Sequence, residues 1–157
     1  MVVLGPGSLY TSVIPNLLVD GIVDAIRDCN GLKVYVCNVM TQEGETEGYT
    51  VSDHIRAIFE HSSQGLFHLC LTNSSPIPKG VAARYAEEGA ELLRCDKEAC
   101  EALGVEIVDR PVATVKNGYV RHHPGHLARE LILLHAERSV RIAGEGRAFR
   151  DDIYRVE

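Results

Sequence analysis

The chain has 157 residues, of which 45% are hydrophobic and 24% are charged, and this composition excludes a disordered or fibrous polypeptide. The formal net charge of −6 argues against a nucleic-acid-binding protein, which needs a basic face. No apolar run reaches the roughly 20 residues that span a bilayer, so we expect no membrane span and a cytoplasmic protein. The five scattered cysteines fit reduced thiols better than disulfides or a zinc site.

The first feature along the chain is an apolar run that enters a Gly-Pro-Gly turn, followed by hydroxyl side chains and a helical pattern. Gly5 and Gly7 allow a sharp turn and a close approach of the backbone to a ligand. Ser8 and Thr11 are suited to capping the helix or donating hydrogen bonds to bound oxygens. Because helix N-termini favour anions, the turn indicates a phosphate or carboxylate site, although an ordinary strand-to-helix connection has the same pattern.

The next part of the chain alternates between helical and strand patterns. Helical spacing over 13–28 is interrupted at Asp20-Gly21, which predicts two short helices with Asp20 capping the second. The following pattern predicts, in chain order, a strand over 33–37, a helix over 50–62, a strand over 67–72, a helix over 79–88, a brief strand at 92–93, a helix over 96–103 and a strand over 105–108.

The last part of the chain predicts a hairpin and a long helix. Two strand patterns over 112–115 and 119–121 are joined by Lys116-Asn117-Gly118, and Asn-Gly favours a tight turn. An amphipathic helix is expected from Pro124 to about Arg138. Residues 139–157 are charged and contain glycine, so we expect a loose tail or a segment that docks on a partner.

The alternation of strands and helices predicts an α/β fold with right-handed crossovers and a mostly parallel sheet flanked by helices. In such sheets, ligands bind beyond the carboxyl ends of the strands. Three loops follow these ends, at residues 5–12, 38–49 and 73–79. We therefore expect the three loops to converge on one edge of the sheet.

The loop over 38–49 carries amides, hydroxyls and three carboxylates within a few residues. Asn38 and Gln42 suit paired hydrogen bonds to a base or sugar, and Glu45 or Glu47 suits ribose hydroxyls. The same composition also fits a solvated acidic loop. The Asp53-His54 pair that follows is either a base oriented by a carboxylate or, as we favour, a helix start capped by Asp53.

Arg121-His122-His123 follows a predicted strand and precedes Pro124. Arg121 is suited to a bidentate pair with a phosphate. The two adjacent histidines point in different directions on an extended backbone, which disfavours joint metal ligation and favours surface or capping roles. A serine-nucleophile site at Ser8 is excluded, because Tyr10 stands where the nucleophile elbow needs glycine.

Several segments share the pattern of one protein family, namely residues 5–18, 35–42, 44–46, 49–54, 84–90 and 120–122. They closely resemble the YvcK-like bacterial gluconeogenesis factors, a family related to CofD, the 2-phospho-L-lactate transferase of deazaflavin cofactor synthesis. The similarity extends to about residue 137. Two positions depart from the family pattern: His123 replaces a usual acidic residue, and Asp20 stands where proline is common.

The resemblance implies a larger Rossmann-like α/β fold, of which residues 1–138 would be the carboxy-terminal half. Family members begin with a Gly-Gly-Gly-Thr-Gly turn and an Asp-Asp-Gly-Gly segment, and neither is in this sequence. The first strand has only three residues before the turn, so we expect it at an exposed edge that pairs with missing strands. A homo-oligomer that buries this open edge is a further expectation.

The resemblance also implies a function. YvcK-like proteins are thought to bind UDP-sugars such as UDP-N-acetylglucosamine and to influence carbon metabolism and cell shape. The alternative is a CofD-like transferase that moves a phospholactyl-type group from a nucleotide diphosphate donor to an alcohol acceptor, with magnesium in the full-length protein. No catalytic residue follows from the comparison. Carried over by position, the ligand-binding residues are Gly5, Gly7, Ser8 and Thr11 at the diphosphate or acceptor pocket, Asn38, Met40, Thr41 and Gln42 in the nucleotide-facing loop, and Arg121 as a charged contact.

Overall fold

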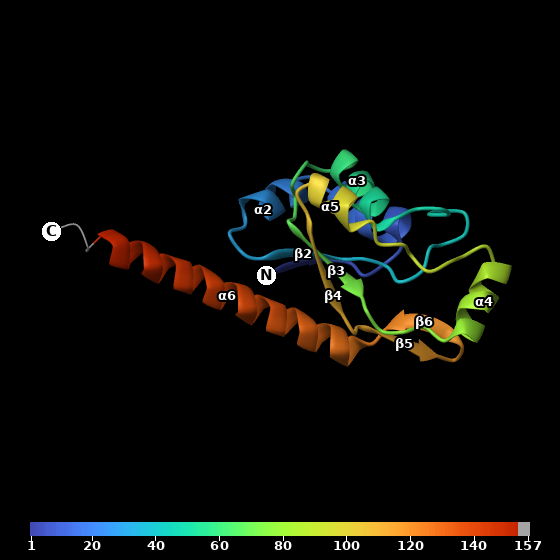
Figure 1. Cartoon of the computed structure of the whole chain (residues 1–157). Helices are drawn as coiled ribbons and strands as arrows, with labels where there is room; N and C mark the ends of the chain where they lie inside the picture. Colours follow the sequence, from blue (N-terminus) through green and yellow to red (C-terminus); the bar gives the residue numbers. More distant parts are fainter. Residues whose placement is uncertain (154–157) are drawn as a thin grey trace.

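A four-stranded parallel sheet lies at the centre of the protein (Figure 1). The computed structural model describes the backbone of residues 1–153 and the side chains of residues 1–139. The strands lie in the order β1-β2-β3-β4, with bounds β1 (Val2–Leu4), β2 (Lys33–Val36), β3 (Leu69–Asn73) and β4 (Glu106–Arg110). In register, Val3 lies opposite Val34, and Tyr35 lies opposite Cys70. The predicted α/β fold with a parallel sheet is confirmed.

The helices form one layer on each face of the sheet (Figure 1). Each crossover advances by one strand with the same hand, so the crossover helices cover the same face. These are the π-helical turn η1 (Leu9–Val13), α1 (Ile14–Leu17), α2 (Ile22–Asp28), α3 (Val51–Glu60) and α5 (Lys97–Ala102). The opposite face is covered by α6 (Pro124–Ile153), and the carboxyl end of the sheet is flanked by α4 (Lys79–Glu87) and the hairpin of β5 (Ala113–Lys116) and β6 (Tyr119–His122).

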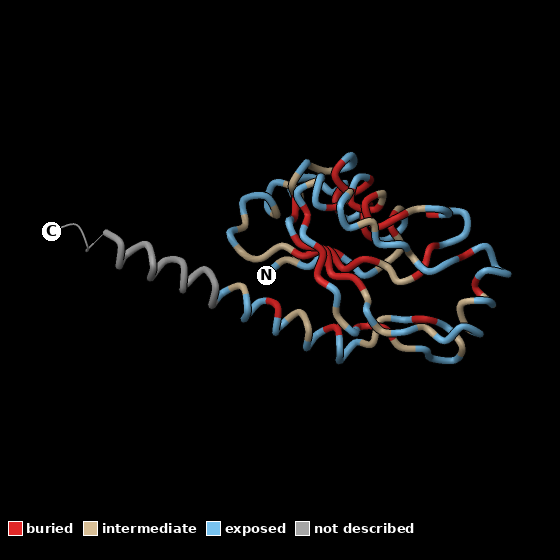
Figure 2. Tube along the Cα trace, in the orientation of Figure 1, coloured by how far each residue is buried: buried red, intermediate tan, exposed pale blue. Residues whose placement is uncertain are grey.

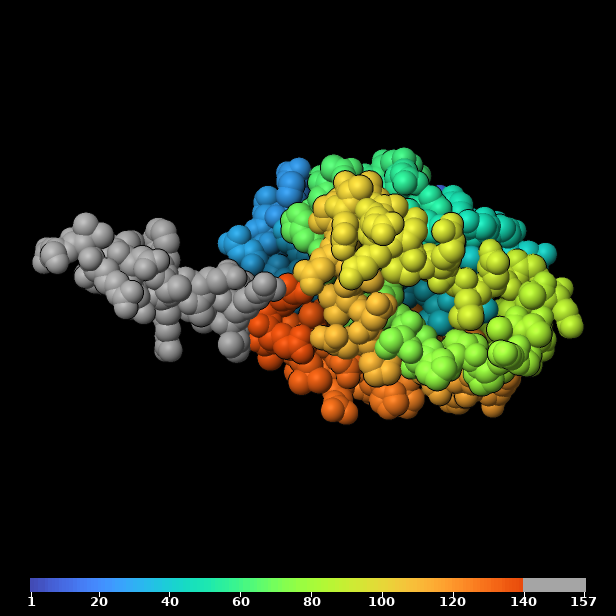
Figure 3. Space-filling model, in the orientation of Figure 1, coloured from blue at the N-terminus to red at the C-terminus, as the bar shows by residue number. Residues whose placement is uncertain are grey.

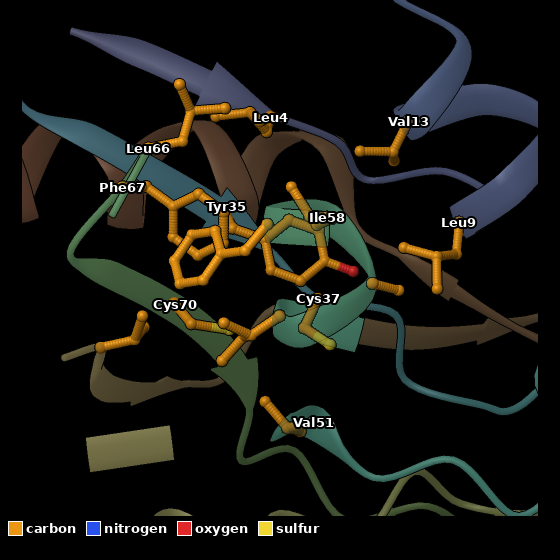
Figure 4. Packing of buried hydrophobic residues seen from close by; sticks show 14 of the residues in the cluster. Leu4, Leu9, Val13, Tyr35, Cys37, Val51, Ile58, Leu66, Phe67 and Cys70 are labelled. Carbon is orange, nitrogen blue, oxygen red and sulfur yellow. The ribbon is translucent and has the colours of Figure 1, made fainter. Parts of the chain in front are cut away.

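The sheet is apolar on both faces because both faces are covered. Buried residues are concentrated along the strands, as the red segments of Figure 2 show. On the crossover side, Tyr35 and Cys70 pack with Ile58 of α3 and Phe67 (Figure 4). On the other side, alternate strand residues pack against the apolar stripe of α6, namely Val34, Val36, Leu69, Leu71 and Val108 against Leu127 and Leu134. This alternation fixes the register of each strand.

Most predicted elements are present, and the hairpin turn is confirmed by positive φ angles of 52° at Asn117 and 76° at Gly118. Two helix predictions were wrong. Asp20 does not cap α2, because the capping position is Gly21, whose φ of 81° favours glycine. The helix from Pro124 continues to Ile153 and not only to about Arg138, and no proline follows Pro124 to end it.

Two further predictions have more limited outcomes. The brief strand at 92–93 is reduced to an isolated bridge between Leu92 and Met40. The division at 138 and the loose state of the tail stay predictions, because side chains beyond 139 and residues 154–157 lie outside the described residues.

β1 is an edge strand, as its shortness predicted, and no described strand pairs with its outer edge. Val3 on this strand is 37% exposed, and Leu18 and Val19 after α1 are 63% and 57% exposed.

No single described helix is long and apolar enough to cross a membrane. Within the described part of the chain, one bent pair, Leu9–Leu17 with Ile22–Asp28, meets the length and composition criteria when its two segments are taken together.

The start of α3 is stabilised by two carboxylates. Thr50 and Asp53 form a reciprocal capping box, which confirms the predicted capping role of Asp53. Asp96 precedes α5 and accepts hydrogen bonds from the amide of Ser52 at 3.0 Å and from its hydroxyl at 2.6 Å. Burial raises the pKa of Asp96, but hydrogen bonds, chiefly those from Ser52, together outweigh it and hold the pKa below 3.8. Asp96 therefore links α3 to α5 mainly in its ionised form.

We predict that Asp96→Asn lowers the free energy of unfolding by about 1 kcal/mol at pH 7, because the charge-assisted bonds to Ser52 weaken. A depressed folded-state pKa gives stability that is present above the unfolded value of 3.8 and lost as pH falls through the folded value. The difference from the parent chain should therefore shrink as pH falls below about 4. Urea unfolding at several pH values measures it, with exposed Glu101→Gln as the control. A difference that stays constant with pH would contradict this role of Asp96.

Candidate functional site

A cavity of about 730 Å³ opens beyond the carboxyl ends of β1 and β2. Its lining comes from segments far apart in the sequence: the turn after β1, the loop after β2, one residue of α4 and strand β6. Figure 3 shows α4, in yellow-green, at the right of the molecule, beyond the carboxyl ends of the strands drawn in Figure 1. The lining residues are Pro6, Gly7, Ser8, Ser12, Asn38, Val39, Met40, Thr41, Gln42, Tyr85, Tyr119, Val120, Arg121 and His122.

The turn after β1 depends on Gly5. This residue has a φ of 77°, and a Cβ atom added there would lie 2.9 Å from the carbonyl oxygen of Val36. Only glycine therefore lets the chain leave β1 so close to the end of β2. Gly7 and Ser8 line the cavity, whereas Gly5 and Thr11 do not belong to its lining. Gly5 acts on the cavity by shaping the turn.

The amino end of η1 is occupied by a side chain of the protein itself. The amides of Tyr10 and Thr11 donate to Glu45 Oε1 at 2.7 and 3.1 Å. The carboxylate thus lies where the sequence predicted a bound phosphate, at the positive end of a helical segment. These two amides are already used, so anion binding in the cavity must depend on other donors.

The loop after β2 is fastened to its surroundings by hydrogen bonds. Gln42 Oε1 accepts a bond of 2.8 Å from the hydroxyl of Ser8, which joins this loop to the glycine turn. Thr41 is buried, with its amide donating to the carbonyl of Glu91 at 2.7 Å and its hydroxyl accepting from the Glu91 amide at 2.8 Å. Met40 packs in an apolar cluster with Tyr85. The hydroxyl of Thr41 is therefore structural, and the other polar side chains with which this loop lines the cavity are Asn38 and Gln42.

Strand β6 brings positive charge to the cavity wall. Two guanidinium groups lie over the ring of Tyr119, with the central carbon atoms of Arg84 and Arg121 at 5.2 and 5.3 Å from its centroid. Tyr85 of α4 accepts a hydrogen bond of 2.9 Å from the amide of Val120 and so holds the strand in place. Arg121 is exposed and lines the cavity, in keeping with the contact predicted for it.

His122 is a cavity residue that sequence reasoning missed. It is half-buried, and its Nε2 atom is buried without a partner among the described residues. Burial lowers the pKa of His122, with an opposing effect of the Cys37 backbone, so the ring is neutral at pH 7. Alternation along β6, which puts His122 on the same side as buried Val120, was the available signal. The neighbouring His123 has the predicted capping role, since its Nδ1 accepts from the amide of His126 at 3.2 Å.

The prediction that three loops converge is right for two loops and wrong for the third. The loop after β3 does not line the cavity. Asn73 Oδ1 instead accepts hydrogen bonds from the amides of Ser75 at 3.0 Å and Ala113 at 2.9 Å, which anchors the hairpin. His54 is fully buried, with its Nδ1 3.0 Å from the carbonyl oxygen of Thr50, so it is no base for a cavity ligand.

The carboxylates of the loop after β2 do not gather into a cation site. Glu45 bonds to η1, and Glu47 accepts from the amide of Gly44. Among the described side chains, no group of three or more His, Cys, Asp and Glu residues is arranged to hold a metal ion. The described residues therefore do not fit a magnesium ion held by the glutamates of this loop.

The fold and the site define a class of protein. A parallel sheet with a polar cavity at the carboxyl ends of its strands is the arrangement in which α/β proteins bind small ligands. Comparison with protein-family models agrees: the model described as 2-phospho-L-lactate transferase CofD matches residues 1–113. The chain belongs to the CofD family.

Individual relatives are named gluconeogenesis factors. The chain is 44% identical over 132 residues to the gluconeogenesis factor of Halalkalibacterium halodurans, covering 84% of this chain and 41% of the relative. It is 40% identical over 132 residues to the gluconeogenesis factor of Bacillus subtilis, covering 84% and 42%. A crystal structure of a Bacillus halodurans protein matches with a TM-score of 0.79 and 45% identity, over 83% of this chain and 42% of that one. The chain thus spans about two fifths of the length of these relatives.

We predict that Glu45→Gln loosens the start of η1, because a neutral amide oxygen accepts more weakly than a carboxylate and no longer faces the helix with a negative charge. A loss of about 1 kcal/mol corresponds to roughly fivefold faster hydrogen exchange at the amides of Tyr10 and Thr11. Exchange measured by NMR tests this, with exposed Glu43→Gln on the same loop as the control. Unchanged exchange at both amides would show that Glu45 does not hold the turn.

Proposed function

We propose that the cavity binds a nucleotide sugar, such as UDP-N-acetylglucosamine, and that the chain is part of a regulatory protein of carbon metabolism and cell shape. The observation that carries the proposal is the joining of the glycine turn, the Asn38–Gln42 loop and Arg121 in one cavity of about 730 Å³. This volume lies within the range of about 300–1,000 Å³ that is typical of small-molecule sites. The names of the relatives, gluconeogenesis factors, support the regulatory role.

The polar groups of the cavity suit the separate parts of such a ligand. The guanidinium of Arg121 matches a diphosphate through paired hydrogen bonds. The hydroxyl of Ser12 supplies a further donor, and Asn38 carries both a donor and an acceptor for the edge of a base. The hydroxyl of Ser8 donates its proton to Gln42, so towards a ligand it is an acceptor. The exposed part of the Tyr119 ring offers a flat apolar surface beside Arg121.

The alternative function is a CofD-like transfer of a phospholactyl-type group from a nucleotide diphosphate donor to an alcohol acceptor. It would use the same cavity, since both functions need a diphosphate contact. The two functions differ in turnover: a regulator binds its ligand and releases it unchanged, whereas a transferase releases free nucleotide when an acceptor is present.

We predict that the chain binds UDP-N-acetylglucosamine saturably in isothermal titration and that Arg121→Lys weakens this binding about tenfold, because a lysine ammonium cannot make the bidentate pair. Arg129→Lys, at an exposed position on α6, is the matched control and should bind like the parent chain. Titrations with and without Mg²⁺, followed by assay of the released nucleotide, separate the two functions. Acceptor-dependent nucleotide release would replace the regulator by the transferase, and the absence of saturable binding would refute the nucleotide-sugar proposal.

A further inference from the structure

We propose that the protein has a second binding site, for a small sugar phosphate, at the amino end of the sheet. The site is a cavity of about 410 Å³ between the loop after α2, the first residues of β2 and β3, and the middle of α6. Figure 1 shows α2 and the middle of α6 at this end of the sheet, and the β5–β6 hairpin at the other. The cavity proposed for the nucleotide sugar lies beyond the carboxyl ends of the strands, so the two sites are separate.

The charged and basic side chains that line this second cavity favour an anion. Lys33 and Arg138 carry a positive charge at pH 7, and His68 and His135 each add one when protonated. Among the described residues, no aspartate or glutamate belongs to the lining, although the whole chain has a formal net charge of −6. A cleft lined by charges of one sign raises the local concentration of ligands of the opposite sign.

The strand register and the helix period bring these side chains together. In the pairing of β2 with β3, the residue after Lys33 lies opposite the residue after His68, so these two stand side by side at the amino edge of the sheet. On α6, His135 and Arg138 are three residues apart and therefore lie on the same face of the helix. Cationic groups from two strands and one helix thus line one cavity.

The contacts of the two permanent cations leave donors for a ligand. Lys33 Nζ donates to the carbonyl oxygen of Arg27 at 2.7 Å, which uses one of its three N–H groups and fixes the ammonium group at the cavity. Arg138 pairs with Glu106 through one Nη2 atom, whereas a guanidinium has five N–H donors. Because Glu106 offsets the charge of Arg138, Lys33 is the cation on which anion binding most depends.

The directions of the donors indicate a phosphate rather than a carboxylate. The cationic groups approach from the sheet edge and from α6, which lie on different sides of the cavity. A phosphate monoester carries about 1.5 to 2 negative charges at pH 7 and has three terminal acceptor oxygens, so it accepts donors from several directions at once. A carboxylate has two oxygens in one plane and a single charge.

The size and the uncharged part of the lining indicate a sugar attached to the phosphate. The volume lies within the range of about 300–1,000 Å³ that is typical of small-molecule sites. Asn30 offers an amide with both donors and an acceptor. The hydroxyl of Ser139 donates to the carbonyl oxygen of His135 at 2.9 Å, so towards a ligand it is an acceptor. These groups match the hydroxyls of a sugar.

Titration with three related compounds tests the class of ligand. We expect glucose 6-phosphate to bind saturably in isothermal titration, inorganic phosphate to bind at least tenfold more weakly because it lacks the hydroxyls, and glucose to show no saturable binding. The absence of saturable binding of glucose 6-phosphate would refute the site. Inorganic phosphate or glucose binding as tightly as glucose 6-phosphate would refute the ligand class.

Substitutions at Lys33 test the role of its charge. We expect Lys33→Gln to weaken glucose 6-phosphate binding about tenfold, because a charge-assisted bond to the phosphate is lost, and Lys33→Arg to bind within threefold of the parent chain. Lys116→Gln, at an exposed position on β5 outside both cavities, makes the same change of charge and should bind like the parent. Equal binding by Lys33→Gln and the parent would overturn the proposal. Equal losses in Lys33→Gln and Lys33→Arg would show that the contact with Arg27 matters instead of the charge, and would overturn it too.

The location of binding is tested on the unaltered chain and with a substitution in the first cavity. On addition of glucose 6-phosphate, the backbone amide resonances of Gly31 and Leu69 should shift, and those of Gly7 and Ser8 should not. Arg121→Lys should leave the affinity for glucose 6-phosphate unchanged. Shifts at Gly7 and Ser8 without shifts at Gly31 and Leu69, or weaker binding by Arg121→Lys, would place the phosphate in the first cavity and refute the second site. The proposed nucleotide-sugar function is tested separately, since UDP-N-acetylglucosamine binding does not depend on Lys33.

Discussion

The carboxylate of Glu45 holds together the two connections from which the cavity is built. It lies in the loop after β2 and accepts the amides of Tyr10 and Thr11 at the start of η1, after β1. The bond of 2.8 Å between Ser8 and Gln42 joins the same two connections nearer the cavity. Without these contacts, two loops at the ends of parallel strands would be independent of each other. With them, the sheet, the glycine turn and the loop after β2 form one wall.

The second wall is positioned by contacts that lie outside the cavity. Asn73, at the end of β3, anchors the first strand of the hairpin, and Tyr85 of α4 fixes the second strand through Val120. Arg121 and His122 therefore reach the cavity from a strand that is bonded to two other elements. Side chains on a fixed strand lose little freedom when a ligand binds, which favours affinity. The loop after β3, which sequence reasoning expected in the site, serves it indirectly through this anchoring.

The sequence predicted the features that depend on local pattern. It failed where a contact between residues far apart in the sequence determines the role of a side chain. Alternating elements and apolar strands were sufficient for the parallel sheet, and the Thr50–Asp53 spacing was sufficient for the capping box. For Glu45 or Glu47 the sequence suggests ribose hydroxyls or a solvated acidic loop, because nothing in this loop shows that η1 takes the carboxylate of Glu45. For His122 the sequence suggests a surface or capping role, although its place two residues after Val120 puts it on the buried side of β6. Both errors concern the partner of a side chain rather than its local structure.

Because β1 lies at the edge of the sheet, the additional length of the relatives bears on how the cavity is completed. β1 is an edge strand, and the glycine turn that follows it lines the cavity, so the cavity also lies at the edge of the sheet. A further strand paired in parallel with β1 would end beside Gly7, and the loop after it would face the same cavity. The relatives extend well beyond the matched region, because this chain spans only about two fifths of their length. A polypeptide that covered Val3 at this edge would therefore add both a strand to the sheet and a wall to the cavity.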